Sequence, residues 1–135
     1  MKKYMLIGLV LVLGMLLAAC GGGDAETESV SLTFEGNDSF QFIPDTASMP
    51  AGAEVEVTLE NAGNLEHSWT LVASDVDATA ATDADVVVTG ASTGSVAPGE
   101  SATITFTAPE AGTYQMVCTV PGHAAGGMVG TVTVN

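Results

Sequence analysis

The chain has 135 residues, of which 47% are hydrophobic, and its sixteen aspartates and glutamates outnumber two lysines to give a formal net charge of −14. This length suits one domain once a processed segment has been removed, because domains of roughly 100–150 residues are the commonest size. The acidic composition excludes nucleic acid as a partner, since phosphates need cationic contacts. It favours partners with cationic patches, although solubility or a salty habitat would select the same composition.

The first nineteen residues have the features of an export signal. Lys2 and Lys3 precede an apolar run from Met5 to Leu17, which is shorter than the ~20 residues needed to cross a ~30 Å hydrocarbon core. The small residues before Cys20 and the three glycines after it resemble a bacterial lipobox, in which the cysteine is lipidated and becomes the first mature residue. We therefore expect a lipoprotein signal peptide over residues 1–19 rather than a permanent membrane helix. The mature chain would be anchored through Cys20 on the extracytoplasmic (periplasmic or outer) face of the cell membrane.

Residues 20–29 form a second segment, the tether, which comprises Cys20 and a run of Gly, Asp, Ala, Glu, Thr and Ser. Such a composition has little to bury, so a flexible linker is expected. Cleavage of the signal would remove both lysines and take the formal charge to −16. It would also leave Cys118 as the only cysteine apart from Cys20, so that no disulfide can form within the domain over residues 30–135.

Apolar and polar residues alternate along most of this domain, and turn-forming Gly, Pro and Asn residues separate the alternating stretches. A period of two indicates strands with one buried face. Short strands at this spacing are typical of an all-β antiparallel sandwich. Residues 74–93 do not alternate, and we leave open a loop, a short helix or an added edge strand there. The predicted strands lie at residues 30–34, 55–59, 69–73, 102–106, 114–118 and 132–134.

The most informative motif is the equal spacing of Cys118, His123 and Met128, which follow one another at intervals of five. With two histidines and six methionines in 135 residues, both offsets coincide by chance less than about once in a thousand. Thiolate and thioether are soft donors that stabilise cuprous copper, and two imidazoles with a thiolate and a weak axial methionine make a blue-copper site. That set needs a second imidazole, and His67 is the only other histidine.

These motifs resemble the cupredoxins, and the four-residue gaps on either side of His123 are most similar to the auracyanin group. The resemblance covers the whole expected domain. It implies a Greek-key sandwich of about eight strands and one type 1 copper ion, with His67, Cys118 and His123 as equatorial ligands and Met128 as the axial ligand. The matching residues are Asn64, His67, Ser68, Trp69, Pro109, Gly112, Thr113, Tyr114, Cys118, Pro121, Gly122, His123, Gly127, Met128, Gly130, Thr131 and Val132.

One departure from the family pattern concerns the residue after the first histidine. Many cupredoxins have asparagine there, and its side chain holds the ligand loop at the residue after the cysteine. This chain has Ser68, which would face Thr119. A shorter hydroxyl makes a weaker link, so the redox potential is the property most open to change.

The resemblance implies an electron carrier rather than an enzyme, and the residues agree, because neither histidine is free to act as a base and no position is left for a small-molecule substrate. The expected partners are redox proteins. A membrane quinol-oxidising complex or a cytochrome would be the donor, and a cytochrome, a reaction centre or an oxidase the acceptor. Two alternatives stay open: a periplasmic copper carrier or storage protein, and a metal-free β-sandwich interaction module.

Overall fold

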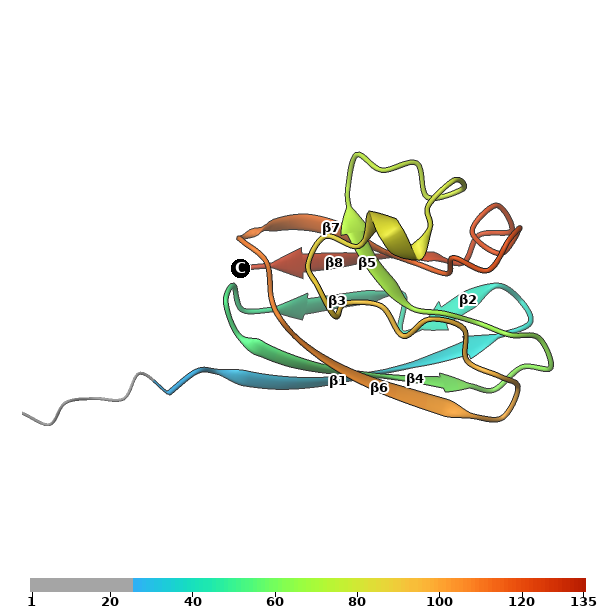
Figure 1. Ribbon diagram of the computed structural model, residues 1–135, viewed down its shortest axis with the longest axis horizontal. Helices are drawn as coiled ribbons and strands as arrows, with labels where there is room; N and C mark the ends of the chain where they lie inside the picture. The colour runs from blue at the N-terminus through green and yellow to red at the C-terminus, as the bar shows by residue number, and fades with distance from the viewer. Residues whose placement is uncertain (1–25) are drawn as a thin grey trace, which may run out of the picture.

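The structure is a computed structural model that describes residues 26–135, so the predicted signal peptide, Cys20 and most of the predicted tether lie outside it. Eight strands form two four-stranded sheets that face each other (Figure 1). The predicted all-β Greek-key sandwich of about eight strands is therefore confirmed. One sheet has the order β2-β1-β4-β6 and the other β3-β8-β7-β5. The strands are β1 (Ser29–Asn37), β2 (Gln41–Ile43), β3 (Thr46–Met49), β4 (Glu54–Asn61), β5 (Thr70–Ala73), β6 (Ser101–Thr107), β7 (Gly112–Val117) and β8 (Val129–Val134).

The core lies between the sheets and follows from the alternation of the strands. In β4, Val55, Val57 and Leu59 are fully buried while the residues between them face outward. Trp69 is also fully buried, and its ring stacks with those of Phe34, at 5.7 Å between centroids, and Phe106, at 6.1 Å. Aromatic burial of this kind supplies a large share of the hydrophobic free energy of folding.

The sheets differ from the expected antiparallel pattern in two places. β1 pairs with β4 in parallel, and β3 pairs with β8 in parallel. The cause is the path of the chain, which leaves β2 in one sheet, forms β3 in the other and returns to the first sheet as β4. A strand that returns after such a crossing can run in the same direction as the strand it joins.

The segment over residues 74–93 combines two of the three structures left open for it. It is mostly a loop, and it contains one turn of 3₁₀ helix, η1 (Asp83–Asp85), with Thr82 as its N-cap. Isolated bridges join Val86 to Val72 and Ser92 to Thr70 at the edge of β5. The segment therefore covers the outer edge of β5 without becoming a full strand (Figure 1).

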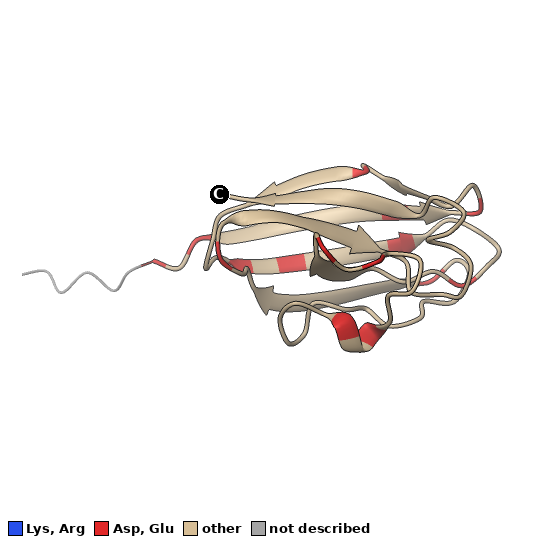
Figure 2. Cartoon of the chain, turned by 90° about the horizontal axis from the view of Figure 1, so that it is seen from above, with Lys and Arg blue, Asp and Glu red and all other residues tan. Residues whose placement is uncertain are grey.

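Acidic side chains are spread over the described residues, which contain no lysine or arginine (Figure 2). They lie along β4, on η1 and in turns at both ends of the sandwich rather than in one cluster (Figure 2). Within residues 26–135, no helix has the length and apolarity needed to span a membrane.

Candidate metal centre

Two of the predicted ligands stand at the ends of the loop between β7 and β8. Cys118 directly follows the last residue of β7, and Met128 directly precedes the first residue of β8. The amide of Cys118 donates to the carbonyl oxygen of Met128 at 3.1 Å, and the amide of Met128 donates to the carbonyl oxygen of His123 at 3.0 Å. This loop, residues 118–128, is called the ligand loop below. These two hydrogen bonds hold the backbone of the loop, and they therefore fix the positions from which the side chains of Cys118, His123 and Met128 extend.

Glycine allows the tight path of the ligand loop at two positions. Gly122 has φ of 87° and Gly127 has φ of 112°, in the left-handed region that favours glycine. Between them the amide of Gly126 donates to the carbonyl oxygen of Gly122 at 3.0 Å. Pro121, at the turn before Gly122, fixes one further backbone angle.

The remaining predicted ligand, His67, lies in the segment between β4 and β5. Its backbone exchanges hydrogen bonds with Val96, at 3.2 Å from its amide and 2.8 Å to its carbonyl oxygen. The side chain of Asn61 donates to the carbonyl oxygens of Leu65 and Val96 at 2.8 Å and 2.9 Å, which ties this segment to the loop before β6. The segment between β4 and β5 that carries His67 thus lies at the same end of the sandwich as the ligand loop, at the right in Figure 1.

His67, Cys118 and His123 form the one cluster of potential metal ligands found among residues 26–135, and their ligand atoms all lie within 4.8 Å of one another. The Nδ1 atoms of the two imidazoles are 3.2 Å apart, and Nδ1 of His123 is 3.5 Å from Sγ of Cys118. His67 is completely buried, Cys118 is 1% exposed and His123 is 8% exposed. Two nitrogens and one sulfur therefore converge on a single point that water scarcely reaches.

Met128 is also fully buried, and it lies close to His67. A β-carbon added to Gly36 at the end of β1 would lie 3.0 Å from Cε of Met128 and 3.4 Å from Cβ of His67. The thioether side chain and the first imidazole therefore share one neighbour, and Gly36 leaves them room. The structure brings Met128 into the neighbourhood predicted for it, while its bond to a metal stays a prediction.

The sulfur of Cys118 has two polar neighbours from the residue after His67. The amide of Ser68 lies 3.3 Å from Sγ, and the hydroxyl of Ser68 lies 3.7 Å from it. The same hydroxyl oxygen accepts a hydrogen bond from the amide of Thr119 at 2.8 Å. Ser68 therefore makes the predicted link to the residue after the cysteine, and it is buried while doing so.

The outer nitrogen of His67 faces a carboxylate that the sequence did not suggest. Oδ1 of Asp38, in the turn between β1 and β2, lies 3.4 Å from Nε2 of His67. The carboxylate also accepts hydrogen bonds from the amide and side chain of Asn64 and from the amide of Leu65, at 2.8–3.2 Å. These contacts, with the Asn64 amide first, lower the pKa of Asp38 from 3.8 to about 2. An ionised Asp38 accepts a hydrogen bond from Nε2–H, which keeps the proton on Nε2 and leaves Nδ1 free to bind a metal.

His123 is the ligand nearest the surface. The ring of Phe40, from the same turn as Asp38, lies 4.7 Å from the His123 ring and also contacts Gly126. Burial lowers the pKa of His123, the nearby His67 lowers it further, and Asp38 opposes both effects. A lowered pKa keeps the imidazole neutral, which is the form that binds metals.

The donor set fits copper better than the common alternatives. Structural zinc sites usually have four imidazole and thiolate ligands and have little use for thioether. One buried thiolate, two imidazoles and a nearby thioether match the blue-copper set. Residues 28–135 also match the family of copper-binding proteins described as the plastocyanin/azurin family.

The chain is a member of this family, the cupredoxins. Its relatives include auracyanin-B of Chloroflexus aurantiacus, which is 34% identical over 135 residues that cover 86% of this chain and 57% of the relative. The copper-resistant cuproprotein CopI of Rubrivivax gelatinosus is 30% identical over 118 residues, covering 83% of this chain and 70% of CopI. The solved structure of auracyanin A, from Chloroflexus aurantiacus, matches with a TM-score of 0.69 and 26% identity over 79% of this chain and 99% of that structure. This chain thus spans little more than half of auracyanin-B and most of the other two.

The cofactor of this cupredoxin is accordingly a single copper ion, and His67, Cys118 and His123 form its potential binding site. The auracyanin resemblance is confirmed as well. Sequence reasoning missed Asp38 and Phe40, because neither belongs to the spaced motif. The complete four-ligand set stays a prediction, and the lipidation of Cys20 concerns a residue outside the described part of the chain.

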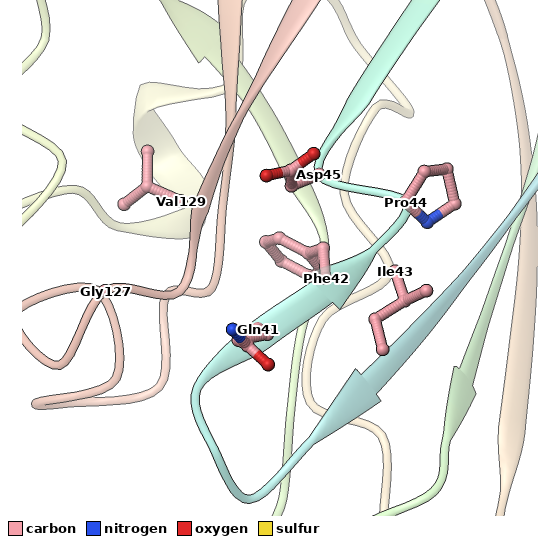
Figure 3. Close-up of a pocket in the computed structure, with 7 residues that line it drawn as sticks. All are labelled: Gln41, Phe42, Ile43, Pro44, Asp45, Gly127 and Val129. Carbon is pink, nitrogen blue, oxygen red and sulfur yellow. The ribbon is translucent and has the colours of Figure 1, made fainter.

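Away from the ligand residues, a surface hollow of about 310 Å³ lies beside β2 and the start of β8 (Figure 3). Asp45 is the only titratable side chain along its wall, and none of the ligand residues reaches it. The hollow therefore has no grouping of reactive side chains that would support a second site. Its lining consists of Gln41, Phe42, Ile43, Pro44, Asp45, Gly127 and Val129.

Proposed function

We propose that this cupredoxin is a blue copper protein that carries single electrons between redox proteins through one type 1 site. The observation that carries the proposal is the convergence of His67, Cys118 and His123, which are all buried and whose ligand atoms lie within 4.8 Å of one another. Met128 would complete the set as the axial ligand. Copper bound by such donors cycles between its cupric and cuprous states, which is the one-electron chemistry that the site would supply.

The protein's own part in electron transfer is to hold the donors still and to keep water out. Hydrogen bonds close the ligand loop at Cys118 and Met128, and Val96 fixes the backbone of His67. Donors that barely move between redox states keep the reorganisation energy small. Burial of His67 and Cys118 excludes solvent from the sulfur, so the thiolate is protected from oxidation by direct attack.

His123 would be the route by which the electron enters and leaves. It is the most exposed of the three donors at 8%, and its neighbours on the ligand loop are small or apolar. A shallow hollow of about 200 Å³ lies beside Cys118, between the ligand loop and residues 78–82. Small side chains there allow a partner to approach closely, and a brief encounter needs only a modest contact area.

The expected partners are redox proteins with cationic patches. Without lysine or arginine among residues 26–135, and with acidic side chains spread along it, the domain has a net negative charge that attracts positive surfaces at low salt. The donor would be a membrane quinol-oxidising complex or a cytochrome, and the acceptor a cytochrome, a reaction centre or an oxidase. We propose no catalytic reaction, because both histidines of the chain lie in the copper site.

A lipid anchor at Cys20 would place this carrier on the extracytoplasmic face of the cell membrane. Support comes from the sequence alone, namely the apolar run, the small residues and Cys20 with its three glycines. Mass spectrometry of the full chain expressed in a bacterium should find a diacylglyceryl group on Cys20. A chain cut elsewhere, or an intact unmodified N-terminus, would disprove the anchor without bearing on the copper site.

The electron-carrier proposal is tested by adding copper(II) to the purified domain. We expect one equivalent to bind and to produce an intense blue thiolate-to-copper absorption that disappears on reduction and returns on oxidation. Copper binding without the blue band, or copper lost readily to a chelator, would contradict it. A domain that binds no copper would instead favour a metal-free interaction module.

The second candidate, a copper carrier or storage protein, gains support from the similarity to CopI, whose name describes copper resistance. Transfer of the ion requires ligands that a competing protein can reach. The burial of His67 and Cys118 speaks against such exchange and in favour of retention. Release of copper to a chelator in minutes, with no stable reduced form, would favour this candidate over the electron carrier.

A further inference from the structure

The segment over residues 74–93 reaches the ligand loop through one short hydrogen bond. The hydroxyl of Thr119, the residue after the cysteine ligand, donates to Oδ1 of Asp83 at 2.7 Å. Asp83 is the first residue of η1 and is otherwise exposed. The same oxygen also lies 3.1 Å from the hydroxyl of Ser92 and 3.2 Å from that of Thr70, and these two hydroxyls are 2.8 Å from each other. Three hydroxyls thus surround the carboxylate oxygen beside Thr119.

Two acceptors lie near the hydroxyl of Ser68. Its oxygen lies 2.9 Å from the hydroxyl oxygen of Thr119 and 3.7 Å from Sγ of Cys118. The Ser68 oxygen already accepts one hydrogen bond, from the amide of Thr119. A serine hydroxyl has only one proton to donate. It can therefore point either at Thr119 or at the sulfur.

Asp83 determines which of the two acceptors receives the Ser68 hydroxyl proton. An ionised carboxylate only accepts hydrogen bonds, so the Thr119 hydroxyl donates its proton to Asp83. The Thr119 oxygen is then available to accept a hydrogen bond from the Ser68 hydroxyl. We propose that Asp83 is a positioning residue that orients the hydroxyl chain from Ser68 through Thr119 to itself. In this orientation the Ser68 hydroxyl points away from the Cys118 sulfur.

The consequence concerns the electron density on the thiolate. With the Ser68 hydroxyl turned away, that residue donates to the sulfur through its amide alone, at 3.3 Å. Each hydrogen bond to a ligand sulfur withdraws charge from it and favours the reduced metal, which raises the potential. By removing one donor, Asp83 holds the potential lower than the ligand set alone would give. This inference rests on the proposed electron-transfer function for its meaning, while the hydroxyl orientation stands without it.

The decisive experiment is a double-mutant cycle on the copper-loaded protein. Asp83→Ala frees the Thr119 proton for Ser68, so the Ser68 hydroxyl turns to the sulfur. We expect a higher reduction potential and a shift of the thiolate-to-copper absorption to higher energy. Loss of a nearby negative charge also raises the potential, but it does so whether or not residue 68 has a hydroxyl. The part due to the hydroxyl chain should vanish when Asp83→Ala is made in a Ser68→Ala background.

Asp85→Ala provides a matched control. Asp85 lies in the same turn of η1 and carries the same charge, but its carboxylate binds Thr82 rather than Thr119. We expect this variant to leave the absorption energy unchanged. Thr119→Val is a second test variant of nearly the same shape as the native residue. It removes the competing acceptor, and it should shift the absorption in the same direction as Asp83→Ala.

A readout without copper tests the orientation directly. In the copper-free protein, NMR should show the Ser68 hydroxyl proton close to the β-protons of Cys118 in Asp83→Ala and not in the wild type. The proposal is overturned if Asp83→Ala shifts the potential equally with Ser68 or with alanine at position 68, or if the hydroxyl contact is the same in wild type and variant. A wild-type protein that fails to turn blue would refute the proposed function instead, and the NMR comparison would still decide this inference.

Discussion

Gly36 and Met128 are in contact across the two sheets, so closely that a β-carbon on Gly36 would lie 3.0 Å from the terminal methyl of Met128. The glycine is the penultimate residue of β1 in one sheet, and the methionine precedes β8 in the other. The same β-carbon would lie 3.4 Å from Cβ of His67. Gly36, which is not a predicted ligand, therefore limits the space available to both Met128 and His67. A position without a side chain thus controls where the thioether lies.

We predict that Gly36→Ala keeps copper but changes its spectrum. The added methyl group displaces the flexible end of Met128, which alters the axial contact while His67 and Cys118 stay in place. Overpacking of this kind costs about 1 kcal/mol or more of unfolding free energy. Electron paramagnetic resonance and denaturant unfolding measure the two effects. Gly112→Ala is the control, since the nearest atom to its β-carbon would be 3.5 Å away, an ordinary contact with Tyr114. Identical spectra in both variants would show that Gly36 does not define the axial space.

Met128→Gln should retain copper and lower the reduction potential. An amide oxygen favours the cupric state more than a thioether does, so the oxidised protein gains stability relative to the reduced one. Cyclic voltammetry of the purified domain measures the change. Met116→Gln is not a suitable control because Met116 accepts a hydrogen bond from the Trp69 indole in the core. Met49→Leu, a core substitution on β3, should leave the potential as it is. A potential unaffected by the loss of the Met128 thioether would argue against axial ligation.

Cys118→Ser should abolish the blue colour, since the thiolate is the charge-transfer donor. The smaller hydroxyl fits the same buried site, so the fold should persist, and circular dichroism provides that check. His67 and His123 remain as nitrogen ligands without the thiolate, so titration calorimetry with copper(II) should report weaker binding. Retention of the intense band would mean that the ligand set is wrong.

Asp38 gives the copper-free protein a specific sensitivity to acid. Its pKa is lowered from 3.8 to about 2 by hydrogen bonds that exist only in the folded state. A lowered native pKa means stabilisation that is present above the unfolded value and is lost as the pH falls toward the folded one. Between about pH 5 and pH 2, Asp38→Asn should therefore lose less unfolding free energy than the wild type does. Asp75→Asn, at another exposed carboxylate, serves as the comparison. Equal losses in wild type and Asp38→Asn would contradict the assignment.

The sequence predicted the strands that are long enough to show a pattern. β4 and β6 alternate over seven or eight residues, and their inward residues were read correctly. β2 and β3 contain only three and four residues, and unlike the equally short β5, which follows Trp69, they have too few large apolar side chains for alternation to stand out, so Phe42 and Met49 were not recognised as core. The parallel pairs escaped prediction because pairing direction depends on which sheet the chain enters next, and side-chain period carries no information about that.

The candidate site divides in the same way. Cys118, His123 and Met128 are close in sequence, so their spacing predicted a site, and His67 followed as the remaining histidine. Asp38 and Asp83 are 29 and 36 positions away from the residues that they contact, His67 and Thr119. Among sixteen acidic residues, nothing local marks these two. Their roles arise from tertiary contacts that only the folded chain reveals.

The absence of lysine and arginine from residues 26–135 also governs how copies of this protein meet each other. Two identical anionic surfaces repel, and the repulsion is strongest when salt is dilute. Electron self-exchange between a reduced and an oxidised copy should therefore be slow at low ionic strength and faster as salt is added. The opposite salt dependence is expected for exchange with a cationic partner. In dilute salt, a reduced copy should therefore transfer its electron to a cationic partner protein faster than to another copy of itself.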